Sequence, residues 1–342
     1  MQEKPCRRLA KCSPRFVIAT VGRHSTDDVD AVLENIYVYD GDNITTAKMV
    51  GRLSDLGLQN TVSSSGMSLS LVNFYNTSSK SYVLGNDASI VKKYNKYSVM
   101  LTSKGSEVKG RLVDGSVYGS GYTFYCLDCN EFYLKQLLFD NLGTYNTGFV
   151  TLQGQTPTHN MDRLIKYTSQ TFTHNQLPQY IPSNVFTMTV SMSFVNITAS
   201  AVNDDTAWKK AFDGRQGYIF SPRLWDPSNV KNSFDFELRN DSTQLNYQLD
   251  LDRMKLDKNM DVLTLQIGSG SGKSPAVNNL YPRDFSSTGI VSSNGNYMKV
   301  GFNGTVAAQV RLSFVVTAAK SAANVGILVS LALISYFNLF LC

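Results

Sequence analysis

The sequence predicts an all-β protein whose short antiparallel strands pack as sandwiches. Three observations carry this prediction: apolar and polar residues alternate with a period of two, β-branched and aromatic residues form short runs, and Gly, Asn, Ser and Asp cluster between the runs. Regularly spaced short strands with turn signals are typical of sandwiches rather than of alternating strand and helix units. We therefore expect antiparallel sheets with an apolar core between them.

The predicted strands follow one another along most of the chain. They are Ile36–Tyr39, Leu69–Phe74, Ser98–Thr102, Tyr122–Tyr125, Phe149–Leu152, Phe186–Val195, Phe234–Leu238, Leu245–Leu251, Val262–Ile267, Tyr297–Phe302 and Val310–Val316. The run Phe16–Gly22 also has the character of a strand. Helical signals are sparse, and Ser25–Glu34 and Asp205–Phe212 each predict only a short helix.

Composition limits the classes of protein to which the chain can belong. Its 342 residues leave room for two or three compact domains. Apolar residues make up 42% and charged residues 17%, which excludes disorder for most of the chain. Lys and Arg are scattered and the net charge is only +5, so we expect no nucleic-acid partner. With three His and five Cys, we predict no catalytic residues, no metal and no cofactor.

The last 18 residues, Val325–Cys342, carry no charge and follow a run of small residues. Such a segment is just long enough to cross a bilayer, but a signal for attachment of a GPI anchor also ends in an apolar tail. We predict a lipid anchor at Ser321, with any residue from Thr317 to Asn324 as an alternative acceptor. A membrane span and a buried terminal element are the other interpretations.

A GPI signal requires entry into the secretory pathway, which normally needs an N-terminal apolar stretch of about 7–15 residues. Residues 1–15 are instead basic and polar. We therefore expect the native N-terminal signal to be missing from this chain, and the mature protein to lie on the extracellular face of the plasma membrane.

The cysteines that can pair are Cys6 with Cys12 and Cys126 with Cys129, whereas Cys342 lies in the apolar tail. The second pair has C-x-x-C spacing, which suits a redox site where a helix N-terminus lowers the thiolate pKa. Asp128 and Glu131 would raise that pKa instead. We predict a structural disulfide or an unpaired surface pair, and His159 and His174 are too isolated to complete a zinc site.

Five Asn residues stand in N-x-S/T sequons, a number that chance alone would give. In a secreted chain they would be acceptors for N-glycosylation because each has a polar or turn-like context. These residues are Asn43, Asn76, Asn196, Asn240 and Asn303.

An internal repeat is the most informative pattern in the sequence. Ile36–Asp42 followed by Val62–Phe74 is echoed by Val262–Gly268 followed by Val291–Phe302. Each copy has a strand that ends at a Gly turn, and then a Ser-Ser-x-Gly turn that leads into a strand closing on Phe. The matching spacing predicts two related sandwiches.

The residues of the second copy resemble a CUB domain. The segments that carry the resemblance are Gly217–Pro222, Phe234–Leu238, Asp261–Gly268, Ser292–Gly295, Met298–Phe302 and Val310–Val316. The chain is most similar to the divergent CUB-like proteins abundant in nematodes, whose members are associated with innate immune and stress responses at the cell surface. The resemblance implies CUB-like antiparallel sandwiches of the jelly-roll type.

This resemblance divides the chain into five parts, with the first copy partial, as if it lacked its opening strands. They are an uncertain N-terminal segment at 1–28, a partial CUB-like domain at 29–82, a β-rich middle region at 83–204, a CUB-like domain at 205–318 and the apolar tail at 319–342.

Calcium is a further implication of the resemblance, because many CUB domains hold the ion with a Glu and two Asp residues. Asp261 matches the middle position. The position after the closing Phe should be an Asp, but Phe302 is followed by Asn303 and Phe74 by Tyr75. Since hard cations need several converging oxygens, we expect no calcium site.

We therefore expect a non-enzymatic cell-surface protein that binds a protein or glycan ligand and reaches the membrane through its C-terminal anchor. The resemblance implies a role in innate immunity or stress. One alternative is a secreted carbohydrate-active hydrolase, which would need two carboxylates roughly 5–10 Å apart in a cleft. Another is a structural component of a surface coat.

Gly268–Ser274 resembles a P-loop but lacks its first Gly, so we predict a hairpin loop there.

Overall fold

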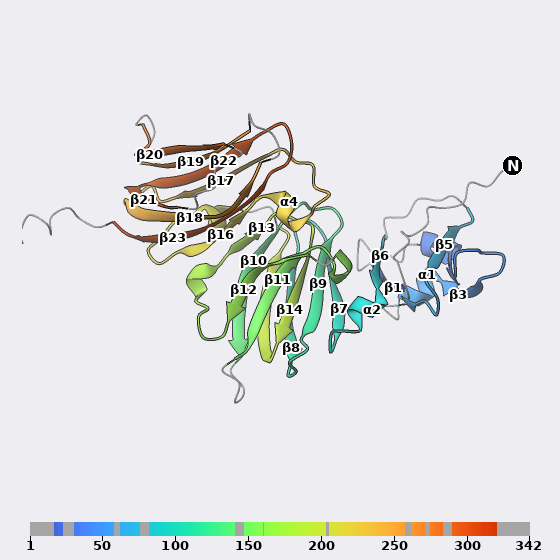
Figure 1. Cartoon of the computed structure of the whole chain (residues 1–342). Coiled ribbons are helices and arrows are strands. Elements are labelled where there is room, and N and C mark those ends of the chain that lie inside the picture. Colours follow the sequence, from blue (N-terminus) through green and yellow to red (C-terminus); the bar gives the residue numbers. More distant parts are fainter. Residues whose placement is uncertain are drawn as a thin grey trace, which may run out of the picture. The chain divides into compact units, whose positions relative to one another are not determined.

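The computed structural model of the chain describes residues 17–22, 31–57, 62–75, 82–140, 147–159, 161–202, 205–256, 261–270, 274–282 and 289–319. In these residues strands prevail and helices are short, which confirms the predicted all-β fold (Figure 1). The chain divides into two compact units. The first comprises Met1–Asp205 with Phe220–Asn229, and the second comprises Thr206–Ile219 with Val230–Cys342.

The N-terminal part of the first unit has two three-stranded sheets, in the orders β4-β1-β6 and β3-β2-β5. Its elements are β1 (Val17–Gly22), the 3-10 helix η1 (Ala31–Asn35), β2 (Ile36–Asp40), β3 (Lys48–Arg52), α1 (Leu53–Gly57), β4 (Val62–Ser63), β5 (Leu69–Asn73), β6 (Tyr82–Asp87) and α2 (Ala88–Val91). A small apolar core joins η1, α1 and the sheets; it contains Leu33, Val38, Leu53, Val62 and Leu69.

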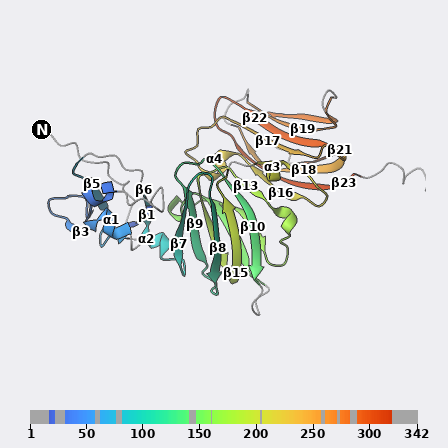
Figure 2. The same ribbon diagram turned by 180° about the vertical axis from the view of Figure 1, so that it is seen from behind.

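The rest of the first unit is a larger sandwich. Its sheets have the orders β12-β11-β14-β9-β7 and β13-β10-β15-β8. Strands of the second sheet are labelled in Figure 2, which views the molecule from the side opposite to Figure 1. The elements are β7 (Tyr97–Thr102), β8 (Glu107–Asp114), β9 (Ser120–Cys126), β10 (Phe132–Asp140), β11 (Phe149–Gly154), η2 (Pro157–His159), β12 (Arg163–Thr168), η3 (His174–Gln176), β13 (Gln179–Ile181), β14 (Val185–Ser191) and β15 (Ser193–Ser200). β7 departs from the antiparallel pattern, because it pairs in parallel with β9.

The prediction of one strand over Phe186–Val195 is wrong. The chain forms β14 and β15 there, and the two strands belong to different sheets. Met192 separates them with a φ of 48°, in the left-handed region that interrupts an extended strand. The sequence did not show this break because apolar and polar residues keep alternating from Phe186 to Phe194, with no Gly, Pro, Asn or Asp between them.

The second unit is a sandwich of two four-stranded sheets, in the orders β16-β23-β18-β21 and β17-β22-β19-β20. Its elements are α3 (Thr206–Lys209), β16 (Gln216–Phe220), β17 (Ser233–Arg239), β18 (Leu245–Lys255), β19 (Val262–Gly268), β20 (Val277–Pro282), β21 (Ile290–Gly295), β22 (Tyr297–Asn303) and β23 (Gln309–Ala318). α4 (Pro222–Trp225) follows β16 and belongs to the first unit. Buried and accessible residues alternate along β17, β19 and β22, as the period-two pattern predicted.

The N-terminal part repeats the strand pairing of the second unit. The order β4-β1-β6 matches β21-β18-β23, and β3-β2-β5 matches β20-β19-β22. The registers agree as well, since Val38 faces Leu71 as Leu265 faces Val300. β16 and β17 have no counterpart among the described strands of the N-terminal part.

One detail of the predicted repeat is wrong. Ile36 faces Asn73 whereas Leu263 faces Phe302, so Asn73 occupies the place of the closing Phe. β5 ends at Asn73, and Phe74 is 47% exposed while Phe302 is 3% exposed. The inward position at this strand end is therefore apolar only in the second unit.

A buried cation lies in the core of the second unit. Arg215 has no exposed surface, and its guanidinium lies 5.4 Å from the ring centre of Trp208 and 5.5 Å from that of Phe314. It donates a hydrogen bond of 2.8 Å to the carbonyl of Gln216. Aromatic faces and a backbone carbonyl thus offset part of the cost of burying the charge.

Close backbone contact fixes α4 against β11 in the first unit. Trp225 is fully buried and its ring meets Phe220 and Phe186 edge to face. A Cβ atom added to Gly154 would lie 1.9 Å from the Trp225 carbonyl oxygen. Only glycine therefore permits this approach.

We predict that Gly154→Ala destabilises the first unit by about 2–3 kcal/mol, because the added methyl group forces α4 away from β11. Gly115→Ala is the matched control, since a Cβ there meets no atom within 4 Å; its effect should stay within about 0.5 kcal/mol. Urea unfolding of the two variants measures both values, and equal stability would contradict this account of the α4 contact.

A carboxylate links the end of β2 to the Ser-Ser-Ser-Gly turn. Asp40 accepts hydrogen bonds from Ser64 Oγ at 2.9 Å and from the Ser65 amide at 2.9 Å. Burial alone would raise the pKa of Asp40, but the hydrogen bonds from Ser65 and Ser64 outweigh it and hold the pKa below its ordinary value.

The lowered pKa gives the N-terminal part a dependence on pH. The Asp40 contribution is complete above the unfolded pKa of about 4 and is lost as the pH falls through the lower folded value. We predict that Asp40→Asn speeds hydrogen exchange of the β2 and β5 amides at pH 7, and that the ratio of variant to wild-type rates approaches one as the pH falls below the folded pKa of Asp40. A rate ratio that does not change with pH would contradict a stabilising role for the charged Asp40 carboxylate.

Candidate functional site

A hollow on the outer face of the sheet β17-β22-β19 is the candidate functional site, and we call it the groove. Strand register places the outward side chains in rows across the three strands: Asp235, Gly301 and Thr264 form one row, and Glu237, Lys299 and Gln266 form the next. The residues between these rows point inward to the core. The same alternation therefore gives this sheet an apolar inner face and a polar outer face.

Gly301 leaves space in the middle of the groove. It stands at the centre of three strands without a side chain, and a Cβ added there would meet only Asp235 Oδ1, at 3.8 Å. The groove is open to solvent and has a volume of about 830 Å³. Its lining exposes both polar and apolar atoms, and consists of Lys231, Ser233, Phe234, Asp235, Val262, Thr264, Gln266, Lys299, Gly301, Phe302 and Asn303.

Charges along the groove are paired locally. Lys299 Nζ lies 3.0 Å from Asp235 Oδ2, directly beside the hollow. Arg239 Nε donates to Glu237 Oε1 at 2.6 Å, and this hydrogen bond raises the pKa of the Arg239 guanidinium. Both pairs are accessible to solvent, so a ligand with hydroxyl or carboxylate groups could exchange for one partner at little cost.

Neutral donors and acceptors complete the polar surface. Gln266 Nε2 donates to Asn278 Oδ1 at 3.1 Å, which orients the Gln266 amide across β19 and β20. Asn232 Nδ2 donates to the carbonyl of Gly304 at 2.8 Å and closes one end of the strand pair. Asn303 is exposed at that end of the groove. The site thus offers amides, hydroxyls, the Lys231 side chain and the Asp235–Lys299 ion pair.

The sequence reasoning did not identify this groove. The signal was present in two segments, because Phe234–Leu238 alternates apolar and acidic residues and a Gly interrupts the strand Met298–Phe302. An interior strand glycine often marks a place where a ligand or another backbone approaches closely. Whether Gly301 marks such a place depends on which strands lie beside it, and the sequence did not specify them.

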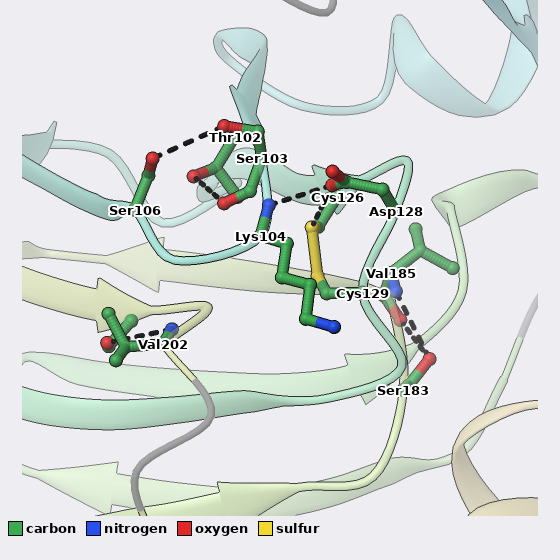
Figure 3. Close-up of a disulfide and its surroundings, with 11 residues drawn as sticks. Thr102, Ser103, Lys104, Ser106, Cys126, Asp128, Cys129, Ser183, Val185 and Val202 are labelled. Carbon is green, nitrogen blue, oxygen red and sulfur yellow. Dashed lines mark hydrogen bonds between the residues drawn. A yellow bond between two sulfur atoms is a disulfide. The ribbon is translucent and has the colours of Figure 1, made fainter.

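The structure places the C-x-x-C pair in a disulfide between Cys126 and Cys129, one of the two predicted alternatives (Figure 3). Both cysteines are buried. Asp128 lies in the loop between them and accepts a hydrogen bond of 2.7 Å from the Lys104 amide, so the loop is attached to the turn that follows β7. Cys6 and Cys12 lie outside the described residues.

The predicted glycosylation sites differ in accessibility. Asn43 and Asn196 are exposed, and Asn43 Oδ1 accepts from the Thr45 amide and hydroxyl in an Asx turn. Asn240 is half-buried, and its side-chain nitrogen donates to the Ala211 carbonyl at 3.1 Å. Asn303 is exposed but lines the groove. Asn76 and the predicted anchor residue Ser321 lie outside the described residues.

Asp261 is part of a hydrogen-bonded turn. Its Oδ1 accepts from the Thr305 amide at 2.9 Å, and its side chain is 3% exposed. Gly304 packs against it so closely that a Cβ would lie 2.8 Å from the Asp261 carboxyl carbon.

In the described ranges, no group of three or more His, Cys, Asp and Glu side chains could hold a metal ion. Within those ranges, too, no helix has the length and apolar character to cross a membrane.

Comparison with known proteins leaves the family open. No protein-family model matches the chain, and no curated protein matches it. The CUB1-EGF-CUB2 domains of rat MASP-1 share 12% identity with it over 64% of this chain and 99% of their own, with a TM-score of 0.20. The corresponding domains of human MASP-1/3 share 12% over 63% and 94%, with a TM-score of 0.22.

A third solved structure, the mosquito-larvicidal Cry4Aa toxin of Bacillus thuringiensis, has 10% identity over 92% of this chain and 54% of its own, with a TM-score of 0.22. Such low TM-scores do not establish a common fold with any of the three. The CUB-like resemblance therefore depends on the residues of the chain itself.

Proposed function

We propose that this chain is a non-enzymatic binding protein of the CUB-like family and that its second unit recognises a glycan in the groove. The observation that carries the proposal is the open hollow of about 830 Å³ at Gly301, whose lining carries amide, hydroxyl and charged groups. Sugar hydroxyl groups both donate and accept hydrogen bonds, and the amides of Gln266 and Asn303 and the hydroxyl of Thr264 can do the same. A preformed concave surface also limits the entropy lost on binding.

The strand pairing supports the CUB-like part of the proposal. The sequence resemblance placed two related copies in the chain, and the paired strands repeat with the same order and register. On this basis we propose a complete CUB-like sandwich in the second unit and a partial one over Val17–Asp87, which is wider than the partial domain at 29–82 suggested by the sequence. The residues between them form a separate sandwich.

The carbohydrate-active hydrolase is the weaker alternative. Glycoside hydrolysis needs two carboxyl groups that face each other across the scissile bond, about 5–10 Å apart. Of the described residues that line the groove, Asp235 alone carries a carboxyl group, and it pairs with Lys299. A paired, accessible carboxylate suits hydrogen bonding to a sugar better than proton transfer.

An extracellular location is part of the same proposal. The Cys126–Cys129 disulfide fits an oxidising compartment, and Asn43 and Asn196 are exposed in their sequons. The apolar tail Val325–Cys342 supplies the proposed GPI signal. The association with innate immunity or stress comes from the family resemblance.

Binding of oligosaccharides tests the groove directly. We predict that the chain, produced without N-glycans because one at Asn303 would occupy the groove, binds members of an immobilised oligosaccharide panel. Gly301→Thr should fill the hollow and weaken binding about tenfold or more, equal to about 1.4 kcal/mol, while the fold is kept because a Cβ fits there. Gly115→Thr is the matched control on the other unit.

Two results would contradict the proposed function. One is the absence of saturable binding to any oligosaccharide by the wild-type chain. The other is equal affinity of the wild-type chain and Gly301→Thr, since a ligand in the groove must contact the filled space.

The proposed anchor has its own test. Phosphatidylinositol-specific phospholipase C applied to intact cells that express the chain with a secretory signal should release it into the medium, because the enzyme cleaves the anchor outside the membrane. Retention of the chain, while a known GPI-anchored control is released, would refute the anchor at Ser321 and its neighbours.

A further inference from the structure

The turn between β8 and β9 presents two apolar side chains at one end of the larger sandwich of the first unit (Figure 1). Val117 is 74% exposed and Tyr118 is 80% exposed. Single exposed apolar residues are ordinary on protein surfaces, but two adjacent ones in one turn need a reason. The backbone around them shows that their exposure is a fixed feature of the fold.

Both ends of this turn are held in place. The carbonyl of Ser116 accepts a hydrogen bond of 3.3 Å from the Met192 amide. Gly119 is buried with a φ of 79°, and an added Cβ there would lie 2.7 Å from Ser191 Oγ. The two apolar side chains therefore stay exposed between two fixed points, and binding through them would cost little backbone entropy.

Parallel pairing of β7 with β9 brings a second loop to the same end. Parallel strands begin at the same edge of a sheet, so the residues before β7 lie beside the turn before β9. The Asn95 amide donates to the Gly119 carbonyl at 2.9 Å. The Gly121 amide donates to the Lys96 carbonyl at 2.8 Å. Lys93 and Lys96 of this loop are both exposed.

Residues 92–96 and 115–119 together are called the tip. Neither segment contains Asp or Glu. Asp114, which adjoins the second segment, is 1% exposed, and its Oδ1 accepts from the Ser116 amide at 2.6 Å. The tip therefore exposes lysine charges and apolar side chains, with no acidic side chain of its own.

This combination fits the surface of an anionic bilayer. Tyr prefers the interface between water and lipid, where its ring lies at the level of the headgroups. Val adds apolar area at the acyl boundary, and Lys is attracted to anionic headgroups. A polyanionic glycan would attract the lysines but would offer no apolar surface to cover Val117.

We propose that the tip docks on a bilayer that contains anionic lipid. Val117 and Tyr118 insert at the level of the headgroups, and Lys93 and Lys96 lie against the anionic lipid. The contact is weak and reversible, because its strength scales with the apolar area buried and with the attraction between charges. The tip belongs to the first unit and the groove to the second, so failure of this proposal leaves the proposed glycan site untouched.

A fluorescent indole in the tip tests the proposal. The full chain with Tyr118→Trp is mixed with saturating vesicles of phosphatidylcholine and phosphatidylserine whose acyl chains are brominated, because bromine quenches an indole that reaches the lipid. The native Trp208 and Trp225 are 3% and 0% exposed, so they are shielded from it. Val230→Trp is the matched control, since Val230 is 88% exposed beside Lys231 on the second unit. This control separates insertion of the tip from attachment of the chain through its apolar tail.

Brominated anionic vesicles should lower the emission of the Tyr118→Trp indole about twofold or more relative to unbrominated ones, since interfacial groups reach about 5–10 Å into the bilayer. Val230→Trp should lose no emission, and neither should Tyr118→Trp in vesicles of phosphatidylcholine alone. Adding Lys93→Glu and Lys96→Glu to Tyr118→Trp should remove most of the quenching.

The proposal would be overturned by equal quenching of the two indoles, by no quenching in anionic vesicles, or by quenching that depends neither on anionic lipid nor on the two lysines. Vesicle binding that needs the lysines but leaves the Tyr118→Trp indole unquenched would overturn it as well, because the tip would then recognise a polyanion without entering the bilayer.

Discussion

Antiparallel pairing of β22 with β17 on one side and β19 on the other is the constraint on which the second unit depends. Side chains alternate between the faces of a sheet, so this register sends Phe236, Val300 and Leu265 into the core together. It sends the row of Asp235, Gly301 and Thr264 outward. A slip of one residue would exchange the two faces. Core and groove are thus two results of one register.

The N-terminal part shows what the same pairing achieves with fewer strands. Val38 is buried at 2% exposure, as Leu265 is at 1%, so the central pair still forms a core. None of its described strands corresponds to β17, however, Leu71 is only partly buried, and Asn73 stands in the place of the inward Phe302. Asp40 and its serine partners then fasten the strand end through hydrogen bonds, where the second unit relies on apolar packing.

Side-chain contacts would govern recognition in the proposed groove. The groove offers side-chain amides and hydroxyls on a sheet whose backbone groups are already paired, so recognition there depends on ligand shape and hydrogen bonds.

The sequence by itself determined the all-β class, most strand positions and the existence of two related copies, because period-two alternation and turn residues act within a few neighbours. It did not reveal the break at Met192, since the alternation of apolar and polar residues runs through this residue without interruption. It also could not show the groove. Gly301 becomes a hollow only when Asp235 and Thr264 lie on either side, and strand pairing across more than thirty residues decides that in three dimensions.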